Sequence, residues 1–234
     1  MEQRSVAFVC AMPMELVPLT RDLELVETDV DGQTVHTGRV NERPVVAIVT
    51  GMGTELAAAG VERLLDAIAV DHVLVVGITG ALENETAIGT LVMPDVVVHG
   101  PSGCEHRHVA LGDHQPEGRM LTDDTLITDP DELVALRSRG VVALDMETAA
   151  VAHVCEARGV TWSVFRAISD RPSDGIDLEV VAMSNQDGTP NHEAIAAYFE
   201  RHPEKAALLA ETGANAALAA ETAAAAAIAA LAHV

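Results

Sequence analysis

Val73-Leu74-Val75-Val76-Gly77-Ile78-Thr79-Gly80-Ala81 begins with four apolar residues and continues into a segment with two glycines. A short, fully apolar run is typical of a central strand that is covered on both faces of a sheet. Glycine is a strong signal for a turn or loop. We therefore expect a buried strand over Val73–Val76 that ends in a glycine-containing loop.

Similar apolar runs recur along the chain and alternate with stretches of helical periodicity. Strands are expected at Val6–Cys10, Gln33–Thr37, Val45–Val49, Leu91–Val98, Val141–Leu144 and Trp162–Ile168. Helices are expected from about Met14, and at Glu55–Ala69, Asp131–Arg139, Glu147–Arg158, His192–Glu200 and Pro203–Ala230. This alternation predicts an α/β fold, a three-layer α/β/α sandwich with a mixed central sheet. No repeat or linker divides the chain, so residues 1–234 are expected to form a single domain.

Two segments lack clear periodicity and are expected to be loops, residues 99–119 and the stretch from Pro172 to about His192. Long loops in compact domains are usually functional or mobile. The first contains five potential metal ligands, His99, Cys104, His106, His108 and His114. A metal site is conceivable there, but a polar loop near the substrate or a subunit contact is the simpler interpretation, and no metal is expected.

Composition excludes several classes of protein. The chain has 234 residues, 49% of them hydrophobic, and a net charge of −22. Such a charge would be repelled by nucleic acid and by an anionic membrane surface, so neither partner is expected. The three cysteines match no metal or redox spacing, and no signal peptide is visible, so a cytoplasmic protein with reduced thiols is expected. The alanine-rich C-terminus is interpreted as a packed helix rather than a membrane span.

Four strand ends carry polar groups directly after an apolar run: Met12–Glu15, Gly77–Ala81, Asp145–Glu147 and Arg166–Asp170. The charged residues that we expect to converge from them are Glu15, Glu147, Arg166 and Asp170. The carboxyl ends of strands are the usual places where α/β proteins build a site. If the strands are neighbours, three carboxylates and one arginine meet in one cleft and suit acid–base chemistry on a polar ligand. The alternative is that each acid is a helix cap or a surface residue, because Asp and Glu favour first turns.

Five motifs together resemble a known family. They are Cys10–Leu16, Thr50–Gly53, Gly77–Leu82, Asp145–Ala150 and Arg166–Asp170. Their order and spacing are similar to those of the 5′-methylthioadenosine/S-adenosylhomocysteine nucleosidases, a branch of the purine nucleoside phosphorylase superfamily. The resemblance extends over residues 6–170 and implies a nucleoside phosphorylase-like fold.

The resemblance also implies roles for individual residues. Asp170 matches the general acid that protonates N7 of the departing purine, which requires a raised pKa. Glu15 matches the general base that activates water, and Arg166 matches the residue that holds that water and Glu15. Glu147 matches the carboxylate that binds the ribose hydroxyls. The remaining substrate-binding residues implied in this way are Thr79, Gly80, Leu126, Ile127, Met146 and Ser169.

Water is the expected co-substrate. Related phosphorylases hold phosphate with arginines, because a dianion needs charged donors. Neither Cys10–Leu16 nor Asp71–Leu74 contains an arginine. Glu15 would repel phosphate, and Arg21 could bind it only if its helix turned inward.

The chain departs from the family pattern at three points. Ile78 stands where related hydrolases usually carry a small hydroxyl residue near the water. Leu126 replaces a stacking phenylalanine of the purine pocket. Residues 99–119 do not resemble the flap that surrounds the 5′ substituent, although His106 or His108 could contact the ribose or the 5′ group.

The leading hypothesis is hydrolysis of a purine nucleoside, such as the 5′-modified adenosines methylthioadenosine and S-adenosylhomocysteine in methionine salvage. A phosphate-dependent phosphorylase, a futalosine-type hydrolase and a catalytically inactive nucleoside-binding protein are the alternatives. No cofactor is expected, because Gly51-Met52-Gly53 lacks the third glycine and the acid of a dinucleotide fingerprint. The resemblance implies a homodimer.

Overall fold

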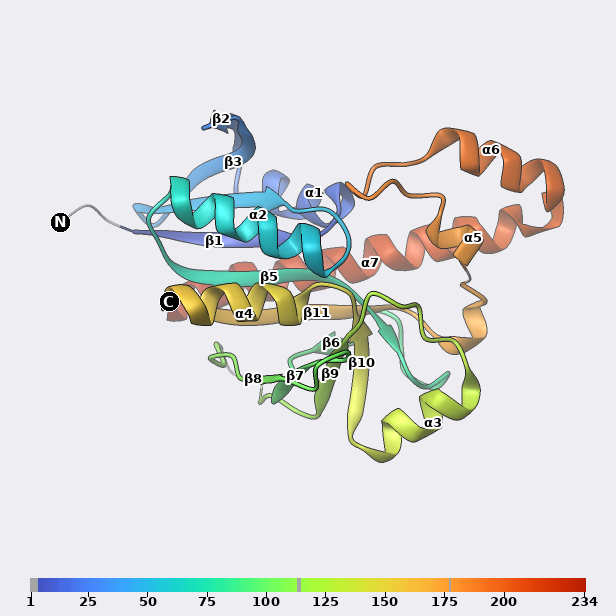
Figure 1. The fold of residues 1–234 in the computed structure, drawn as a ribbon. Coiled ribbons are helices and arrows are strands. Elements are labelled where there is room, and N and C mark those ends of the chain that lie inside the picture. The colour runs from blue at the N-terminus through green and yellow to red at the C-terminus, as the bar shows by residue number, and fades with distance from the viewer. Residues whose placement is uncertain (1–3, 113–114, 177) are drawn as a thin grey trace.

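The computed structural model describes residues 4–112, 115–176 and 178–234. Its strands form one sheet (Figure 1). They are β1 (Ser5–Cys10), β2 (Val26–Val30), β3 (Gln33–Val40), β4 (Arg43–Val49), β5 (Val70–Ala81), β6 (Leu91–Val92), β7 (Val96–His99), β8 (Glu105–His106), β9 (Arg119–Thr122), β10 (Val141–Asp145) and β11 (Thr161–Asp170).

The strand order is β2-β3-β4-β1-β5-β10-β9-β7-β8, and β11 pairs with β5 and β6. β1 and β11 run parallel to β5, whereas β10 runs antiparallel to it. The sheet is therefore mixed, as predicted. β5 has three partners, so it joins the two halves of the sheet and brings the carboxyl ends of β1, β10 and β11 to one edge.

β5 is longer than the sequence suggested. Val73–Val76 are at most 1% exposed, as expected of a central strand. The strand then continues to Ala81 instead of ending in a loop at Gly77. β5 is this long because β11 pairs with residues 72–80 on one side of it and β10 pairs with residues 80–81 on the other. These ladders satisfy the backbone groups and hold the glycines in extended conformation.

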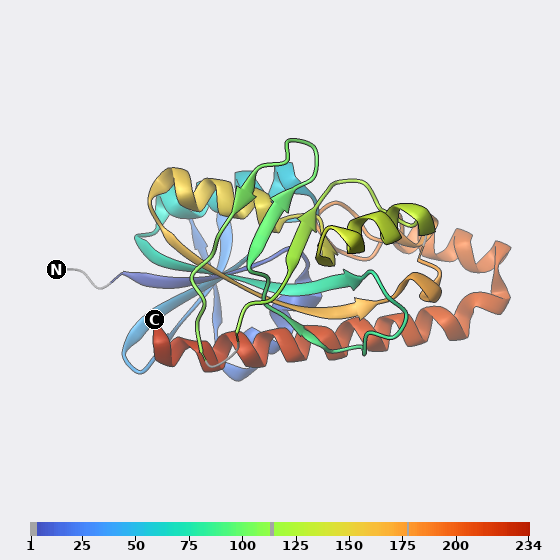
Figure 2. The ribbon, with the colours of Figure 1, turned by 90° about the horizontal axis from the view of Figure 1, so that it is seen from below.

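Helices cover both faces of the sheet (Figures 1 and 2). α2 (Thr54–Ala67) and α4 (Thr148–Arg158) lie on one face, and α1 (Pro13–Asp22) and α7 (Ala206–Ala230) lie on the other. α3 (Pro130–Ser138) packs beside β10, and the short α5 (Leu178–Val181) and α6 (His192–Arg201) follow β11. The predicted three-layer α/β/α sandwich is confirmed.

The two layers of helices are packed by different side chains. The side of α2 and α4 is rich in branched residues such as Val61 and Val151. The side of α7 is lined by small residues, and Ala219, Ala223 and Ala227 are fully buried. Residues 203–233 could cross a membrane by length and composition alone. Half of this helix instead packs its apolar stripe against β5 and β11.

Several expectations about short elements were wrong. Residues 99–119 contain β8 and the start of β9, and Leu91–Val98 is split into β6 and β7. The stretch after Pro172 contains α5. β2 was not predicted, because it is an edge strand whose residues are mostly exposed and carry no apolar alternation. Short strands carry too few residues for a periodic signal, so tertiary pairing decides them.

Candidate active site

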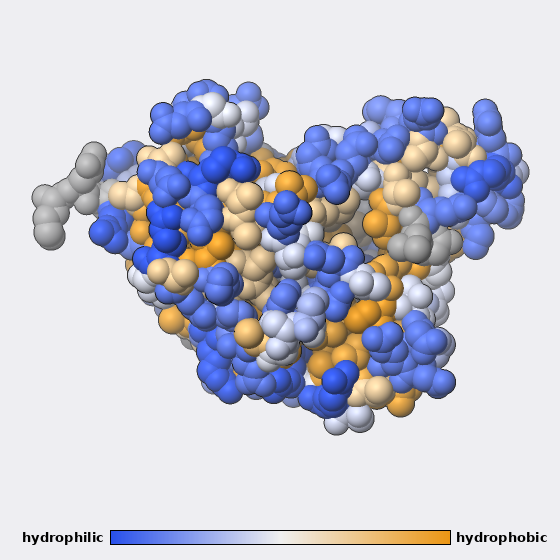
Figure 3. Space-filling model, in the orientation of Figure 1, coloured by the Kyte–Doolittle hydropathy of each residue, from blue (hydrophilic) through white to orange (hydrophobic). Residues whose placement is uncertain are grey.

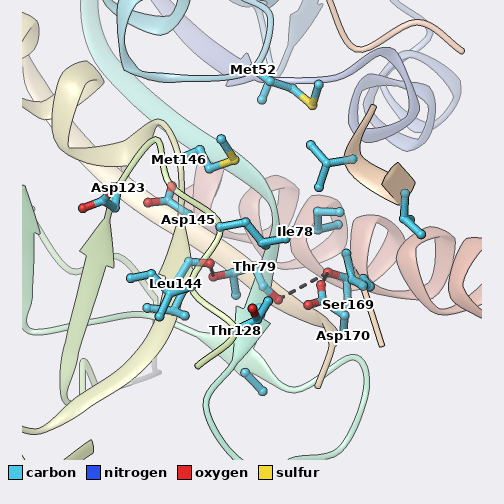
Figure 4. Close-up of a pocket in the computed structure, with 18 of the residues that line it drawn as sticks. Met52, Ile78, Thr79, Asp123, Thr128, Leu144, Asp145, Met146, Ser169 and Asp170 are labelled. Carbon is cyan, nitrogen blue, oxygen red and sulfur yellow. Dashed lines mark hydrogen bonds between the residues drawn. The ribbon is translucent and has the colours of Figure 1, made fainter. Parts of the chain in front are cut away.

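A cavity of about 500 Å³ lies at the edge where β1, β5, β10 and β11 end. Its lining includes all ten residues that the sequence assigned to a site: Glu15, Thr79, Gly80, Leu126, Ile127, Met146, Glu147, Arg166, Ser169 and Asp170. Figure 4 shows how the residues from β5, β10 and β11 converge on it. The four strand ends therefore meet in one place.

Arg166 is the centre of a buried charge cluster, which we define as Arg166 with Glu15, Asp145 and Glu147. Arg166 is only 2% exposed. Its Nη2 donates to Asp145 Oδ2 at 2.8 Å and to Glu147 Oε2 at 3.2 Å, and its Nη1 lies 3.4 Å from Glu15 Oε1. Burial would lower the pKa of Arg166, but the three surrounding carboxylates raise it above its ordinary value. The guanidinium is therefore charged and fixed.

Glu15 is held at the bottom of the cavity by backbone donors. The amides of Ala11 and Met12 donate to its Oε2 at 2.8 and 2.9 Å, and the amide of Ile78 donates to its Oε1 at 2.8 Å. Including Arg166, four donors face the four lone-pair positions of one carboxylate. The Arg166 contact is the longest, so a water molecule can displace it most easily.

Gly77 is required by this packing and not by a turn. A Cβ at residue 77 would lie 2.1 Å from Glu15 Oε1 and 2.6 Å from Arg166 Nη1. Only glycine leaves room for the buried carboxylate and guanidinium beside the strand.

Glu147 connects the cluster to the cavity. Its Oε1 accepts a hydrogen bond from the Gly53 amide at 2.9 Å, and its Oε2 faces Arg166. Burial raises the pKa of Glu147 to about 7, Arg166 opposes this shift, and the neighbouring Asp145 carboxylate adds to it. The protonated form of Glu147 is therefore favoured relative to a free glutamic acid.

Asp170 stands apart from the charge cluster, at the end of β11. Its Oδ1 accepts a 2.6 Å hydrogen bond from the Ser169 hydroxyl. A Cβ at Gly80 would lie 3.2 Å from Asp170 Oδ2, so the missing side chain leaves the carboxyl close to β5. Burial raises the pKa of Asp170, the Ser169 hydroxyl lowers it, and the Asp174 carboxylate raises it further. The protonated form is thus favoured relative to a free aspartic acid.

The walls between these polar groups are mostly apolar. Leu126, Ile127 and Met146 line the cavity. Thr79 donates its hydroxyl to the Leu144 carbonyl at 2.7 Å, while its own carbonyl lies 3.3 Å from Ser169 Oγ (Figure 4). Ile78 contributes its backbone, because its amide binds Glu15 and its carbonyl accepts from Arg166 at 3.1 Å. The departure of Ile78 from the family pattern therefore leaves these backbone contacts intact.

Sequence reasoning missed one part of the lining. Met12, Met14, Met52, Val180 and Val181 also face the cavity. The methionines lie in the motifs that the sequence singled out, but apolar residues at loop and helix ends give no functional signal. Val180 and Val181 belong to α5, which was expected to be a loop.

His99, His106 and His108, the described histidines of residues 99–119, do not line the cavity. His106 pairs with Glu156, His108 contacts the Pro94 carbonyl, and His99 contacts Ser102. His106 and His108 therefore do not reach the cavity of their own chain, and a contact of either with a substrate in a neighbouring subunit stays a prediction. His114 lies outside the described residues. Among the residues that the structure describes, no group of three His, Cys, Asp or Glu side chains is placed to hold a metal ion.

The chain is similar in sequence to known proteins. The sequence profile of the phosphorylase superfamily matches residues 5–122 and 104–200. The 5′-methylthioadenosine/S-adenosylhomocysteine nucleosidase of Maridesulfovibrio salexigens is 27% identical over 233 residues, which cover 86% of this chain and 93% of that protein. The nucleosidase of the same name from Actinobacillus succinogenes is 30% identical over 173 residues, covering 62% of this chain and 75% of that protein.

A solved structure shares the fold. The crystal structure of the Helicobacter pylori 5′-methylthioadenosine/S-adenosylhomocysteine nucleosidase, in complex with a pyrrolidine ligand, superposes with a TM-score of 0.73. It is 18% identical, and the match covers 100% of both chains. The chain therefore belongs to the phosphorylase superfamily and, within it, to the family of N-glycosidases named 5′-methylthioadenosine/S-adenosylhomocysteine nucleosidases.

Proposed function

We propose that this protein hydrolyses the N-glycosidic bond of a 5′-modified adenosine, such as methylthioadenosine or S-adenosylhomocysteine, and releases the free base. The observation that carries the proposal is the separation of two kinds of carboxyl group in one cavity. Asp170 forms no ion pair with an arginine of the described residues and has a raised pKa, whereas Glu15 is bonded to three amides and faces Arg166. Acid and base chemistry can therefore act on opposite sides of one sugar.

Asp170 is proposed as the general acid. Cleavage of a purine riboside leaves positive charge on the sugar, and the base departs more easily when its N7 is protonated. A buried carboxyl with a raised pKa can donate that proton near neutral pH. Ser169 holds one oxygen of Asp170, so the other is left to face the ligand.

Glu15 is proposed as the general base that removes a proton from water at the anomeric carbon. The water would replace the 3.4 Å contact between Glu15 and Arg166. Arg166 would then hold the water, which would bridge the guanidinium to the carboxylate of Glu15. Glu147, next to the Gly53 amide, is proposed to accept hydrogen bonds from the ribose hydroxyls, and Met146 to pack under the sugar.

Hydrolysis is favoured over phosphorolysis by the charges in the cavity. The two arginines of its described lining are Arg166 and Arg171. Arg166 faces three carboxylates, and Arg171 pairs with Asp174. A phosphate dianion would find no uncommitted cation there and would meet Glu15, so water is the better nucleophile.

The test is incubation of the purified protein with a panel of purine nucleosides, with and without phosphate, while free base is measured. Base release at the same rate in both buffers is expected, with the free sugar, which keeps its 5′ substituent, as the other product. Release only with phosphate, with a sugar 1-phosphate as product, would establish a phosphorylase. Binding without turnover would establish an inactive nucleoside-binding protein. A homodimer and a cytoplasmic location are also proposed from the family, and sedimentation and cell fractionation would test them.

A further inference from the structure

Asp145 is the member of the charge cluster to which the proposed reaction assigns no role. It is the last residue of β10, and its side chain is 1% exposed. Its Oδ2 accepts a 2.8 Å hydrogen bond from Arg166 Nη2, whereas the Arg166 contacts with Glu147 and Glu15 measure 3.2 and 3.4 Å. Asp145 is therefore the carboxylate of the cluster that Arg166 contacts most closely.

Two fully buried threonine hydroxyls hold the Asp145 carboxylate. Thr122 Oγ1 donates to Asp145 Oδ1 at 2.5 Å and accepts a 3.0 Å hydrogen bond from the Ala149 amide. Thr148 Oγ1 donates to Asp145 Oδ2 and accepts from Arg166 Nε at 3.3 Å. Because an amide and a guanidinium can only donate, the proton of each hydroxyl is left to point at Asp145. The direction of both hydrogen bonds is therefore fixed.

The contacts of Asp145 join β9, β10, β11 and the start of α4. Thr122 and Asp145 are register partners on the parallel strands β9 and β10. At the start of α4, the amides of Glu147 and Thr148 lie 3.4 and 2.9 Å from Asp145 Oδ2. The positive end of a helix favours a negative charge at such a place. Asp145 thus serves as an acceptor toward donors from every side, which is the role of an ionised carboxylate.

Asp145 and Thr148 contact one edge of the Arg166 guanidinium, the edge formed by Nε and Nη2. On the other side, Nη1 donates to the Ile78 carbonyl at 3.1 Å and faces Glu15 at 3.4 Å. The guanidinium is planar and its donors form a rigid fork, so fixing one edge fixes the direction of the remaining N–H groups. Asp145 therefore determines where Nη1 points, which is toward Glu15 and the place proposed for the water.

The charge cluster is shielded from bulk water. Its side chains are at most 9% exposed. Figure 3 shows apolar side chains in the recess between α3 and the α5–α6 region, and α3 and α5 both contribute to the cavity lining. Hydrogen bonds and charges act more strongly in such surroundings than in water. The direction of each donor in the cluster therefore matters for the chemistry.

We infer that Asp145 is a positioning residue, which acts on the reaction by fixing the guanidinium of Arg166. The inference rests on the proposed function, in which Arg166 holds the attacking water. Both oxygens of Asp145 are occupied by protein donors, so Asp145 acts through Arg166 and not on the substrate. With Asp145 as the closest partner of Arg166, Glu147 is left to accept from the ribose and Glu15 to accept the proton of the water. Groups that take part in a reaction must be held in this way by their neighbours.

The experiment measures kcat and KM for methylthioadenosine across pH in the wild-type protein and in Asp145→Asn. The amide keeps the shape of the side chain but loses its charge, so kcat should fall about 10- to 100-fold as Arg166 turns from its position. The acid limb of kcat/KM should also move to lower pH. Glu147 must be ionised to accept from the ribose, and the Asp145 charge raises the pKa of Glu147. The other groups that face Glu147, which are Arg166, Glu15 and the Gly53 amide, remain in this variant.

Asp129→Asn is the matched control. Asp129 accepts hydrogen bonds from two amides at the start of α3, but it is exposed and is not part of the cavity lining. Its substitution should leave kcat and the acid limb unchanged. A wild-type kcat in a folded Asp145→Asn protein would overturn the inference. So would a reduced kcat with an unmoved acid limb, because that result would show a purely structural role. No base release by the wild-type protein from any purine nucleoside would overturn the proposed function, and the inference with it.

If Asp145→Asn does not fold, Thr122→Val and Thr122→Ser test the same contact. Valine keeps the shape of threonine and favours strands, whereas serine keeps the hydroxyl and leaves a small gap. Positioning through the hydroxyl predicts that kcat falls several-fold in Thr122→Val and stays near the wild-type value in Thr122→Ser. Packing alone predicts the reverse order. A Thr122→Val protein that is at least as active as Thr122→Ser would overturn the inference.

Discussion

The charge cluster and Asp170 face the same cavity but are built in opposite ways. In the cluster, Arg166 faces three carboxylates, and Glu15 is bonded by three amides besides. Among the described residues, Asp170 has one hydroxyl partner, Ser169, and no ion pair with a cation. The same edge of one sheet therefore surrounds Glu15 with amide donors and an arginine at one place and leaves Asp170 with a single hydroxyl partner at another.

The difference shows how one fold separates acid from base. A buried carboxyl stays ionised when donors and a cation replace the water that it loses. A buried carboxyl keeps its proton when no donor or cation replaces the water that it loses. The following substitutions test whether the charge cluster and Asp170 differ in this way. They begin with the largest expected effect.

Arg166→Met should break the cluster most severely. It leaves three buried carboxylates without their cation, so the free energy of unfolding should fall by about 3–5 kcal/mol, and base release should be lost. Urea unfolding measures the first effect. Arg158→Met is the control, because Arg158 pairs with Glu62 and Asp66 at the surface, so a much smaller loss of stability is expected. Equal losses in the free energy of unfolding for the two variants would show that the buried charge cluster stabilises the fold no more than a surface ion pair does.

Asp170→Asn should reduce activity strongly but, unlike Arg166→Met, should not reduce stability. The amide cannot donate the acid proton, so kcat should fall by about 10²–10⁴-fold. Stability should be unchanged or increased, because a carboxyl whose ionised form is disfavoured by burial has been replaced by a neutral group. Thermal unfolding and single-turnover base release test both parts. A variant that retains full kcat would show that Asp170 is not the acid.

Glu147→Gln should change the pH dependence of stability. The folded pKa of about 7 lies above the ordinary value of 4.5, so the folded state binds this proton more tightly than the unfolded state. The contribution to stability is therefore complete below pH ~4.5 and is lost as the pH rises through 7. The loss should amount to about 2–3 kcal/mol, and Glu147→Gln should remove it. Urea unfolding at pH 5 and pH 8 measures the slope, and an identical slope in both proteins would contradict the raised pKa.

Ser169→Ala should have the smallest effect on activity of these substitutions. It removes the hydroxyl that donates a hydrogen bond to Asp170. The Ser169 hydroxyl lowers the pKa of Asp170, so its removal should raise that pKa further. The alkaline limb of the kcat/KM profile should then move to higher pH, while kcat at its optimum falls less than tenfold. Rescue by Ser169→Thr would support a hydrogen-bonding role, and a shift to lower pH would argue against it.

Much of the fold and of the site could be predicted from the sequence. Apolar runs such as Val73–Val76 and Val6–Cys10 predict central strands, because a buried strand must be apolar on both faces. Polar residues directly after such runs, Glu15 and Asp170 among them, predict a shared site, because strand ends meet at one edge of a sheet. All ten predicted site residues line the cavity.

Other features of the site depend on contacts between distant segments, and only the tertiary structure determined them. The ion pairs of Arg166 with Glu15, the need for glycine at position 77 and the packing of the Gln186 carbonyl on Met52 each join segments far apart in the chain. Composition and periodicity record which residues prefer burial and where strands end. They do not record which partners a buried charge finds, because desolvation and hydrogen bonding act through space and are set only when the strands and loops are packed.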